Sequence, residues 1–365
     1  GHRPKFSGTR KTHQRSGSRP TSRQPTGQPP RRDRTGQTRS GQSATRGAKT
    51  SGTYIQSTGG SLIGGNAKPS RWEPIRTFEG HNSWVSSVAI NPQIALIASG
   101  GFDDVVNLWN LKTGAITYSL KDHTRGINGL AFSPQGQLLV SCSDDQTIKV
   151  WNVGTGKLLY TLQGHARDVT SVAIGARGVL LVSGSEDRTI RVWKLDRGSP
   201  LKVLSGDAGM IKCVAITPDE KTIISGGFDN KIRLWQMPSG DTTRVLSGHL
   251  KSISDIALSR DGRLLASASK DKTVRLWSLR SGNLIHTLQG HTREVNSVAI
   301  TPDQRTVVSA GGDSLIKVWD AKTGELIETL MEHHSSVTSV AVDAGGRYMV
   351  SASSDKLIKL WQRKK

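Results

Sequence analysis

The chain has 365 residues, of which 50 are Lys or Arg and 29 are Asp or Glu, so its formal net charge is +21. Two cysteines exclude a disulfide scaffold, and no apolar run reaches the roughly 18 residues of a membrane span or forms a signal peptide behind the basic N-terminus. We therefore expect a soluble, cytoplasmic protein without a membrane span.

Residues 1–70 are predicted to be a disordered basic tail rich in Arg, Gly, Ser, Pro and Thr. They contain 14 Lys or Arg but one acidic residue, Asp33, and so carry +13 of the net charge. Their few apolar residues cannot bury enough surface to offset the entropy of ordering the chain. The other 295 residues carry only +8, so any partner attracted by positive charge alone is expected on the tail.

After the tail, the sequence repeats every 42 residues without an insertion, in tryptophan, serine, aspartate and histidine. The tryptophans are Trp109, Trp151, Trp193, Trp235, Trp277, Trp319 and Trp361. The serines are Ser99, Ser141, Ser183, Ser225, Ser267, Ser309 and Ser351, and the aspartates are Asp103, Asp145, Asp187, Asp229, Asp271, Asp313 and Asp355. The histidines are His81, His123, His165, His249, His291 and His333, with Asp207 in the fourth repeat. This regularity indicates stacked copies of one structural unit.

Each period contains the signals of four short strands and no helix. In the sixth period, β-rich runs at 295–300, 305–310, 315–319 and 325–330 are separated by turn sequences rich in Gly, Asp, Thr and Pro. Four such strands form one antiparallel sheet, which cannot bury both faces alone. Seven sheets packed in a closed ring leave no long edge exposed, so residues 71–365 are predicted to form one all-β domain.

The ring is predicted to close by an interlock of the two ends of this domain. Only four residues follow Trp361, too few for a fourth strand in the seventh sheet. Residues 74–79 align with the fourth strand of the other repeats at multiples of 42. They are therefore predicted to supply the missing strand of the last sheet.

The repeated residues resemble those of the WD40 family. Gly-His, then Ser-x-Ser/Gly-x-Asp, then Ile-Lys/Arg-Val/Leu-Trp recur over about residues 72–362, and Trp319-Asp320 is the one literal Trp-Asp pair. The uniform repeats are similar to those of bacterial, particularly cyanobacterial, members. The resemblance implies a seven-bladed WD40 β-propeller in which residues 74–79 close blade seven.

The resemblance also implies that the repeated polar residues are structural tetrads. In each tetrad the Trp indole bonds to Ser, Ser to His, and His to Asp. A Ser-His-Asp hydrolase needs one asymmetric pocket, whereas this trio recurs around the ring, so we assign no catalytic residue. Blade four lacks the histidine, and there Asp207 is expected near Asp229, with one of the two protonated or with Lys212 or Arg233 as a neutralising cation.

No metal, cofactor or small-molecule substrate site is predicted. The histidines lie a whole blade apart, and the His333-His334 pair has no Cys or carboxylate at ligand spacing. Six Lys or Arg residues two positions before the tryptophans are interpreted as part of the strand pattern rather than as a nucleic-acid stripe. They are Lys149, Arg191, Arg233, Arg275, Lys317 and Lys359.

Carried over by position, the family's docking surface is the top face around the central channel. Its candidate residues here are Trp84, Phe102, Asp144, Asp168, Glu186, Met210, Lys212, Phe228, Lys270 and Glu294. Two aromatic residues on blade one and a Met-Phe pair on blade four flank an acidic sector. This pattern suits a peptide or loop that carries Arg or Lys. The alternative that Phe102 and Phe228 cap their own blades stays open.

These features predict a non-enzymatic scaffold for protein–protein interaction, whose top face binds a peptide or loop of a partner within a larger complex. The alternative is association with nucleic acid or ribonucleoprotein through the basic tail, where release of phosphate counterions would provide affinity without sequence readout. A third interpretation is that the tail is only a soluble linker.

Overall fold

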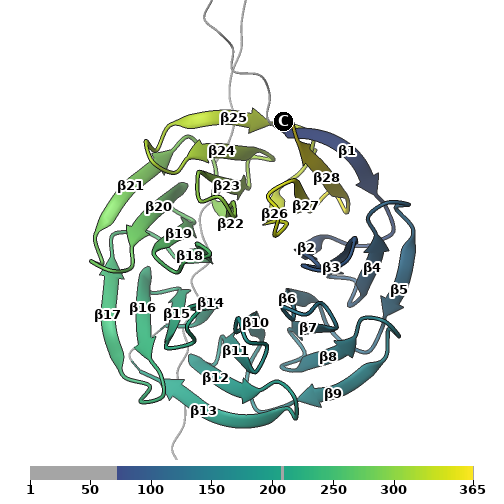
Figure 1. The fold of residues 1–365 in the computed structure, drawn as a ribbon, viewed down its shortest axis with the longest axis horizontal. Coiled ribbons are helices and arrows are strands. Elements are labelled where there is room, and N and C mark those ends of the chain that lie inside the picture. Colours follow the sequence, from purple (N-terminus) through teal and green to yellow (C-terminus); the bar gives the residue numbers. More distant parts are fainter. Residues whose placement is uncertain (1–71, 207–208, 365) are drawn as a thin grey trace, which may run out of the picture. The chain divides into compact units, whose positions relative to one another are not determined.

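The computed structural model describes residues 72–206 and 209–364, and the predicted tail of residues 1–70 lies outside them. The described residues form 28 strands in seven four-stranded antiparallel sheets, which are arranged as blades around a central channel (Figure 1). The predicted all-β, seven-bladed propeller is thereby confirmed.

The strands follow one another from the channel outward in each blade. Blade one contains β2 (Val85–Ile90), β3 (Leu96–Gly101), β4 (Val106–Asn110) and β5 (Ile116–Leu120), and blade two contains β6 (Ile127–Phe132), β7 (Leu138–Ser143), β8 (Ile148–Asn152) and β9 (Leu158–Leu162). Blade three contains β10 (Val169–Ile174), β11 (Leu180–Ser185), β12 (Thr189–Lys194) and β13 (Ser199–Ser205), and blade four contains β14 (Ile211–Ile216), β15 (Thr222–Gly227), β16 (Lys231–Gln236) and β17 (Thr242–Ser247). Blade five contains β18 (Ile253–Leu258), β19 (Leu264–Ser269), β20 (Thr273–Ser278) and β21 (Leu284–Gln289), and blade six contains β22 (Val295–Ile300), β23 (Thr306–Gly311), β24 (Ile316–Asp320) and β25 (Leu326–Leu330). Blade seven contains β26 (Val337–Val342), β27 (Tyr348–Ser353), β28 (Ile358–Arg363) and β1 (Trp72–Phe78).

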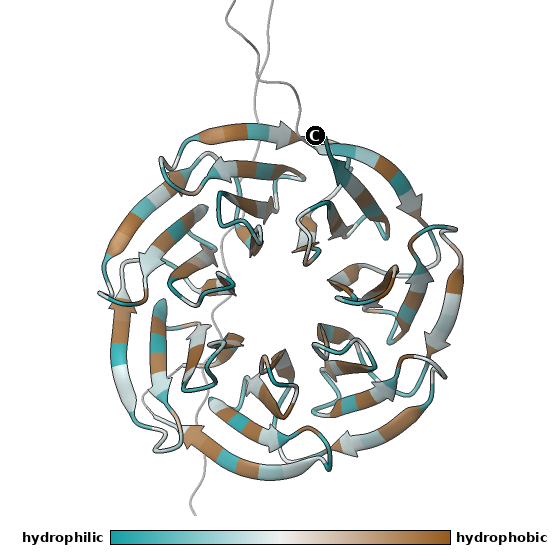
Figure 2. Ribbon diagram, viewed as in Figure 1, coloured by the Kyte–Doolittle hydropathy of each residue, from teal (hydrophilic) through white to brown (hydrophobic). Residues whose placement is uncertain are grey.

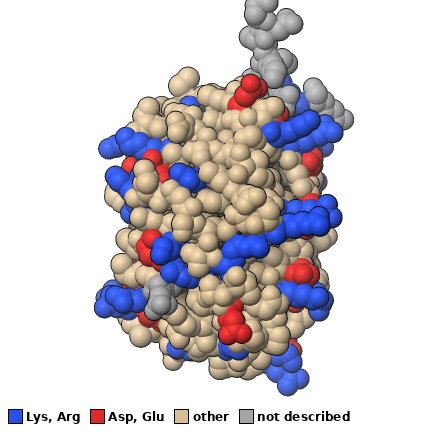
Figure 3. Space-filling view, turned by 90° about the vertical axis from the view of Figure 1, so that its left-hand side faces the viewer, with Lys and Arg blue, Asp and Glu red and all other residues tan. Residues whose placement is uncertain are grey.

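Burial changes from the inner to the outer strands of each blade. The second strand is almost wholly buried, as in β3, where all six residues are, because neighbouring blades cover both faces of the sheet. The outer strand faces solvent, as in β5, where Leu120 alone is buried. Hydrophobic and hydrophilic residues alternate along these outer strands (Figure 2). On the side of the ring shown in Figure 3, Lys and Arg are interspersed with acidic and uncharged residues.

The apolar core lies at the junctions between neighbouring blades. At the junction of blades two and three, Trp193 packs with Val140 and Leu162 of the preceding blade. At the junction of blades five and six, Trp319 packs in the same way with Val274 of blade five. Each blade therefore completes the core of the one before it, and the stability of the ring is shared among its blade junctions.

The first strand of the described chain completes the last blade. β1 pairs antiparallel with β28, with Trp72 opposite Arg363 and Phe78 opposite Ile358. Trp72 and Phe78 are each 1% exposed. The strand predicted at 74–79 therefore begins two residues earlier, because Trp72 packs into the junction of blades six and seven, and it ends before the exposed Glu79.

Candidate protein-binding face

The repeated polar side chains form hydrogen-bonded chains in the six blades that contain the histidine. In each, the His Nδ1 donates to the Asp carboxylate (2.7–3.0 Å), the Ser Oγ donates to His Nε2 (2.7–2.8 Å), and the Trp Nε1 donates to the same Ser Oγ (2.8–2.9 Å). The tetrads thus satisfy their own buried polar atoms and tie the loop before the first strand to the second and third strands.

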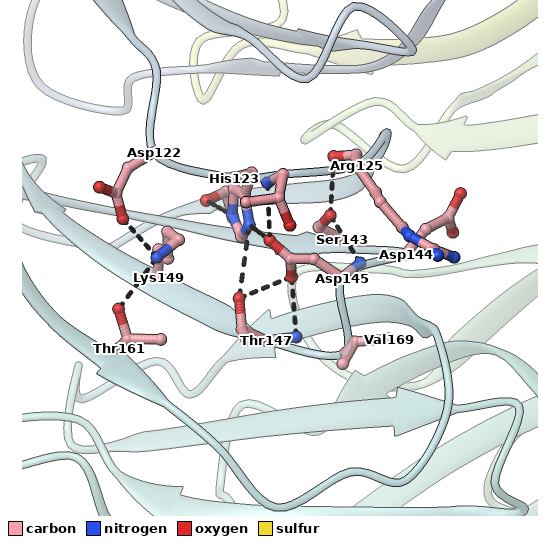
Figure 4. A network of polar contacts seen from close by, with 12 residues as sticks. Asp122, His123, Arg125, Ser143, Asp144, Asp145, Thr147, Lys149, Thr161 and Val169 are labelled. Carbon is pink, nitrogen blue, oxygen red and sulfur yellow. Dashed lines mark hydrogen bonds and ion pairs between the residues drawn. The ribbon is translucent and has the colours of Figure 1, made fainter.

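The tetrad aspartates are held in the ionised form. Figure 4 shows Asp145 of blade two between His123 and Thr147. Burial alone would raise the pKa of Asp145, but the hydrogen bonds from His123 and Thr147 outweigh it and hold the pKa well below its usual value. Asp187 and Asp271 are held in the same way by their own His and Thr neighbours.

We expect Ser141→Ala to lower the free energy of unfolding by about 2 kcal/mol, because buried Trp151 Nε1 and His123 Nε2 both lose their partner. Ser225→Ala in blade four is the matched control: Trp235 donates to this serine (2.8 Å), but no histidine is present, so the loss should be smaller. Chemical denaturation measures both values. Equal losses would contradict the role of the four-membered chain.

Blade four departs from the pattern. Asp207 and Ala208 lie outside the described residues. The predicted contact between Asp207 and Asp229 therefore also lies outside them. Of the two cations considered, Arg233 forms an ion pair with Asp229, whereas Lys212 donates to Glu186 (3.0 Å).

The channel has a volume of about 570 Å³ and is lined by the innermost strands. Trp84 and Phe102 line it together with deeper residues such as Val88. Trp84 is 56% exposed and Phe102 is 47% exposed, and their rings meet edge to face, with centroids 6.1 Å apart and planes at 87°. They form an exposed aromatic pair at the channel mouth.

Phe102 meets Trp84 of its own blade and also reaches over the next blade. A Cβ atom at Gly126 would be 2.7 Å from Phe102 Cδ1 and 3.5 Å from Asp144 Oδ2. Glycine at this position of blade two therefore makes room for the ring. Phe102 thereby lies close to Asp144, the first residue of the acidic sector.

The acidic sector consists of Asp144, Asp168 and Glu186, all half-buried. Burial raises the pKa of Asp168, the nearby charges of Asp144 and Glu186 raise it further, and Arg125 partly offsets them. Asp168 therefore lies close enough to the other two carboxylates to be repelled by their charges. Asn128 donates to Asp144 (2.6 Å).

The predicted apolar pair on blade four has a different environment from the one expected. Phe228 is 39% exposed, and its ring centroid lies 5.2 Å from Lys212 Nζ and 5.7 Å from Lys270 Nζ. Met210 is half-buried and its carbonyl accepts from the Phe228 amide (3.0 Å). This sector is therefore aromatic and cationic. Glu294 lies apart from it, against Gly312 of blade six.

Most residues five positions after the histidine tie blades together. Asn128 donates to the carbonyl of Val169 (3.0 Å), and Thr170 donates to that of Ile211 (2.9 Å). Ser86, Asn296 and Thr338 bond to the next blade in the same way. Lys212 turns instead to Glu186, and the buried Ser254 Oγ has no hydrogen-bond partner.

The next residue along β18, Asp255, also lines the channel and is not among the residues predicted from the sequence. The equivalent positions hold Ser87, Gly129, Ser171, Cys213, Ser297 and Ser339, so Asp255 is the one acidic residue in this column of the repeat. Its carboxylate accepts hydrogen bonds from Ser297 Oγ (2.8 Å), Val298 N (3.0 Å) and Ile256 N (2.8 Å). Aligning the repeats by their period provides the signal that could have found it.

Among residues 72–206 and 209–364, no group of three or more His, Cys, Asp and Glu side chains is placed to hold a metal ion. None of these residues belongs to a helix long and apolar enough to cross a membrane.

Comparison with known proteins gives one family and several partial relatives. The chain matches the family described as "WD domain, G-beta repeat" seven times, at residues 72–110, 114–152, 156–194, 198–236, 240–278, 282–320 and 324–362. It is 41% identical over 49 residues to the pre-mRNA-splicing factor prp46 of Emericella nidulans (13% of this chain, 11% of that protein). It is 50% identical over 44 residues to the small ribosomal subunit protein RACK1 of Glycine max (12% and 14%) and 33% identical over 73 residues to the nuclear distribution protein nudF 2 of Penicillium rubens (19% and 16%). Each alignment thus spans less than a fifth of the relative.

Proposed function

The chain belongs to the WD40 repeat family, and on this basis we propose that it is a non-enzymatic scaffold that binds a peptide or loop of a partner protein on the top face of its propeller. The observation that carries the proposal is the exposed aromatic pair of Trp84 and Phe102 at the channel mouth. The names of the relatives, a splicing factor and a ribosomal subunit protein, support a partner that is part of a larger complex. We place this activity in the cytoplasm.

Trp84 supports the proposal because the repeat does not need a tryptophan at this position. The equivalent residues in the other blades are Gly126, Asp168, Met210, Ser252, Glu294 and Ser336. A Trp side chain that is more than half exposed gains more apolar burial on binding than any of these, and Trp is enriched at the energetic centres of interfaces.

The charges beside the aromatic pair support a basic partner segment. Phe102 adjoins Asp144, and Asp168 and Glu186 continue the acidic sector around the channel. An Arg or Lys next to an apolar residue in the partner would pair with Asp144 or Asp168 while the apolar residue packs on Trp84. Binding would also lower the raised pKa of Asp168, since the partner's cation offsets its neighbours.

We expect Trp84→Ala to weaken binding by about 2 kcal/mol or more, roughly thirtyfold in Kd. Peptides are first selected against the full chain from a displayed random library, and their affinities are then measured by calorimetry. Leu201→Ala is the control, because Leu201 is 53% exposed but lies on the outer strand β13. Peptides without Arg or Lys, or equal binding to both variants, would count against the proposed surface.

A second candidate function is binding of nucleic acid through residues 1–70, which lie outside the described residues. It is favoured by their 14 basic residues against one acidic residue. Several basic side chains of the propeller are already engaged, such as Lys149 with Asp122 and Lys317 with Thr329. RNA retention that falls steeply with salt and is lost on removing residues 1–67 would support this function.

A further inference from the structure

The central channel contains an acidic side chain whose charge no described residue compensates. Asp255 lines the channel from the inner strand β18, and none of the ion pairs among the described residues includes it. Charged groups taken out of bulk water are normally paired. Asp255 is thus an unpaired acidic residue at a position where the other repeats have no acidic residue.

The carboxylate of Asp255 also has an unused acceptor position. A carboxylate offers about four hydrogen-bond acceptor positions, two on each oxygen. Ser297 Oγ and Val298 N both donate to Oδ2, whereas Ile256 N alone donates to Oδ1. One position on Oδ1 stays open.

The adjacent residue provides a second unpaired polar atom. Ser254 also lines the channel, and its buried Oγ has no hydrogen-bond partner. In the equivalent position of blade three, Thr170 bonds to the carbonyl of the next blade. Ser254 does not make this bond, but its buried oxygen has no accessible surface toward the channel, so Asp255 alone presents an open acceptor position there.

The strands around β18 supply no free cation to Asp255. On β14, Cys213 and Lys212 are the titratable residues, and Lys212 donates to Glu186 (3.0 Å). β19 and β22 contain no titratable side chain. Burial raises the pKa of Asp255 to about 6, so the carboxylate is charged above that pH.

We propose that Asp255 binds an organic cation, an alkylammonium or guanidinium group, that enters the channel from the mouth at Trp84 and Phe102. An N–H donor of such a group matches the open position on Asp255 Oδ1, and its positive charge compensates the carboxylate. A divalent metal is disfavoured, because Ca²⁺ takes six to eight oxygen ligands and no group of three acidic, His or Cys side chains meets in the described residues. The inference deepens the proposed function, since it names the chemical group that a partner segment would insert.

The test uses small cations, so that it does not depend on the partner. n-Butylammonium and n-butylguanidinium are titrated into the full chain at pH 8 and pH 5, and the NMR signal of the Asp255 carboxyl carbon is followed. n-Butanol is the uncharged control and KCl is the inorganic one. We expect saturable binding at pH 8 that is at least tenfold weaker at pH 5, because Asp255 is then mostly protonated.

Variants assign the binding to Asp255. Asp255→Ser introduces the residue found at four equivalent positions, Ser87, Ser171, Ser297 and Ser339, and circular dichroism checks its fold. It should abolish binding, whereas Ser254→Ala, which removes a buried hydroxyl, and Asp261→Asn, outside the channel, should leave it unchanged. These titrations are followed by calorimetry, which does not need the Asp255 signal.

Three results would overturn the site: binding retained in Asp255→Ser, equal binding of n-butanol, or competition by K⁺ at the concentration of the organic cation. If such a result accompanies peptide binding that still depends on Trp84, only the channel site fails. If small cations bind but Trp84→Ala has no effect on peptides, only the proposed top-face function fails.

Discussion

Replacing Phe78 with Ala lowers the free energy of unfolding by about 3–5 kcal/mol, as is usual for a buried Phe in a tightly packed core. Phe78 is 1% exposed, packs edge to face on Trp109 with centroids 5.6 Å apart, and contacts the cluster at the junction of blades seven and one. The lost packing energy comes from β1, the strand that closes the ring. We therefore expect blades one and seven to separate first.

The control for this prediction lies three residues away on the same strand. Ile75 is 45% exposed, so Ile75→Ala removes apolar area that is already partly hydrated and should cost far less. Guanidinium denaturation gives both free energies, and hydrogen exchange of β28 amides reports the opening of the junction. An unfolding midpoint for Phe78→Ala that matches the one for Ile75→Ala would show that ring closure does not depend on this strand's buried face.

Replacing Asp255 with Ser stabilises the propeller at pH 8, by at most about 3 kcal/mol, and leaves its stability unchanged near pH 4. Burial raises the pKa of Asp255 from 3.8 to about 6, so the folded state binds the proton more tightly than the unfolded state does. The favourable contribution of Asp255 is therefore complete below its unfolded pKa and is lost as the pH rises through 6. Serine retains the acceptor for the next blade, as Ser171 does for Val214 N (3.2 Å).

Comparing variants at each pH separates this effect from general acid unfolding. The tetrad aspartates have lowered pKa values, so their contribution is lost as the pH falls, but this loss is common to both proteins. Asp261→Ser should change stability in the opposite direction, because hydrogen bonds from Ser259 and from the Arg263 amide lower the pKa of Asp261. This control should lose stability at high pH and not at low pH. A gain for Asp255→Ser that is the same at pH 4 and pH 8 would contradict the role of the charge.

The candidate binding face was only partly predictable from the sequence. The spacing placed Trp84 and Phe102 together on blade one, and the centroids of their rings are 6.1 Å apart. It did not predict that the amines of Lys212 and Lys270 would both lie close to the Phe228 ring. These residues come from two blades, and their contact depends on the direction of long, flexible side chains. In the same way, the position of Phe102 over Gly126 depends on how blade two sits against blade one.

The sequence alone determined the number of blades, the all-β fold and the residues that could form tetrads, because each depends on spacing within one repeat or on whole multiples of 42 residues. The tertiary structure decided which polar residues are used between repeats. It showed that residues such as Thr170 bond to the next blade, that Ser254 does not, and that Asp255 lines the channel without a cation. Because all repeats have the same spacing, the spacing cannot distinguish equivalent positions in different blades. Only the packing of neighbouring blades determines whether a polar atom at such a position has a hydrogen-bond partner or can accept one from a ligand.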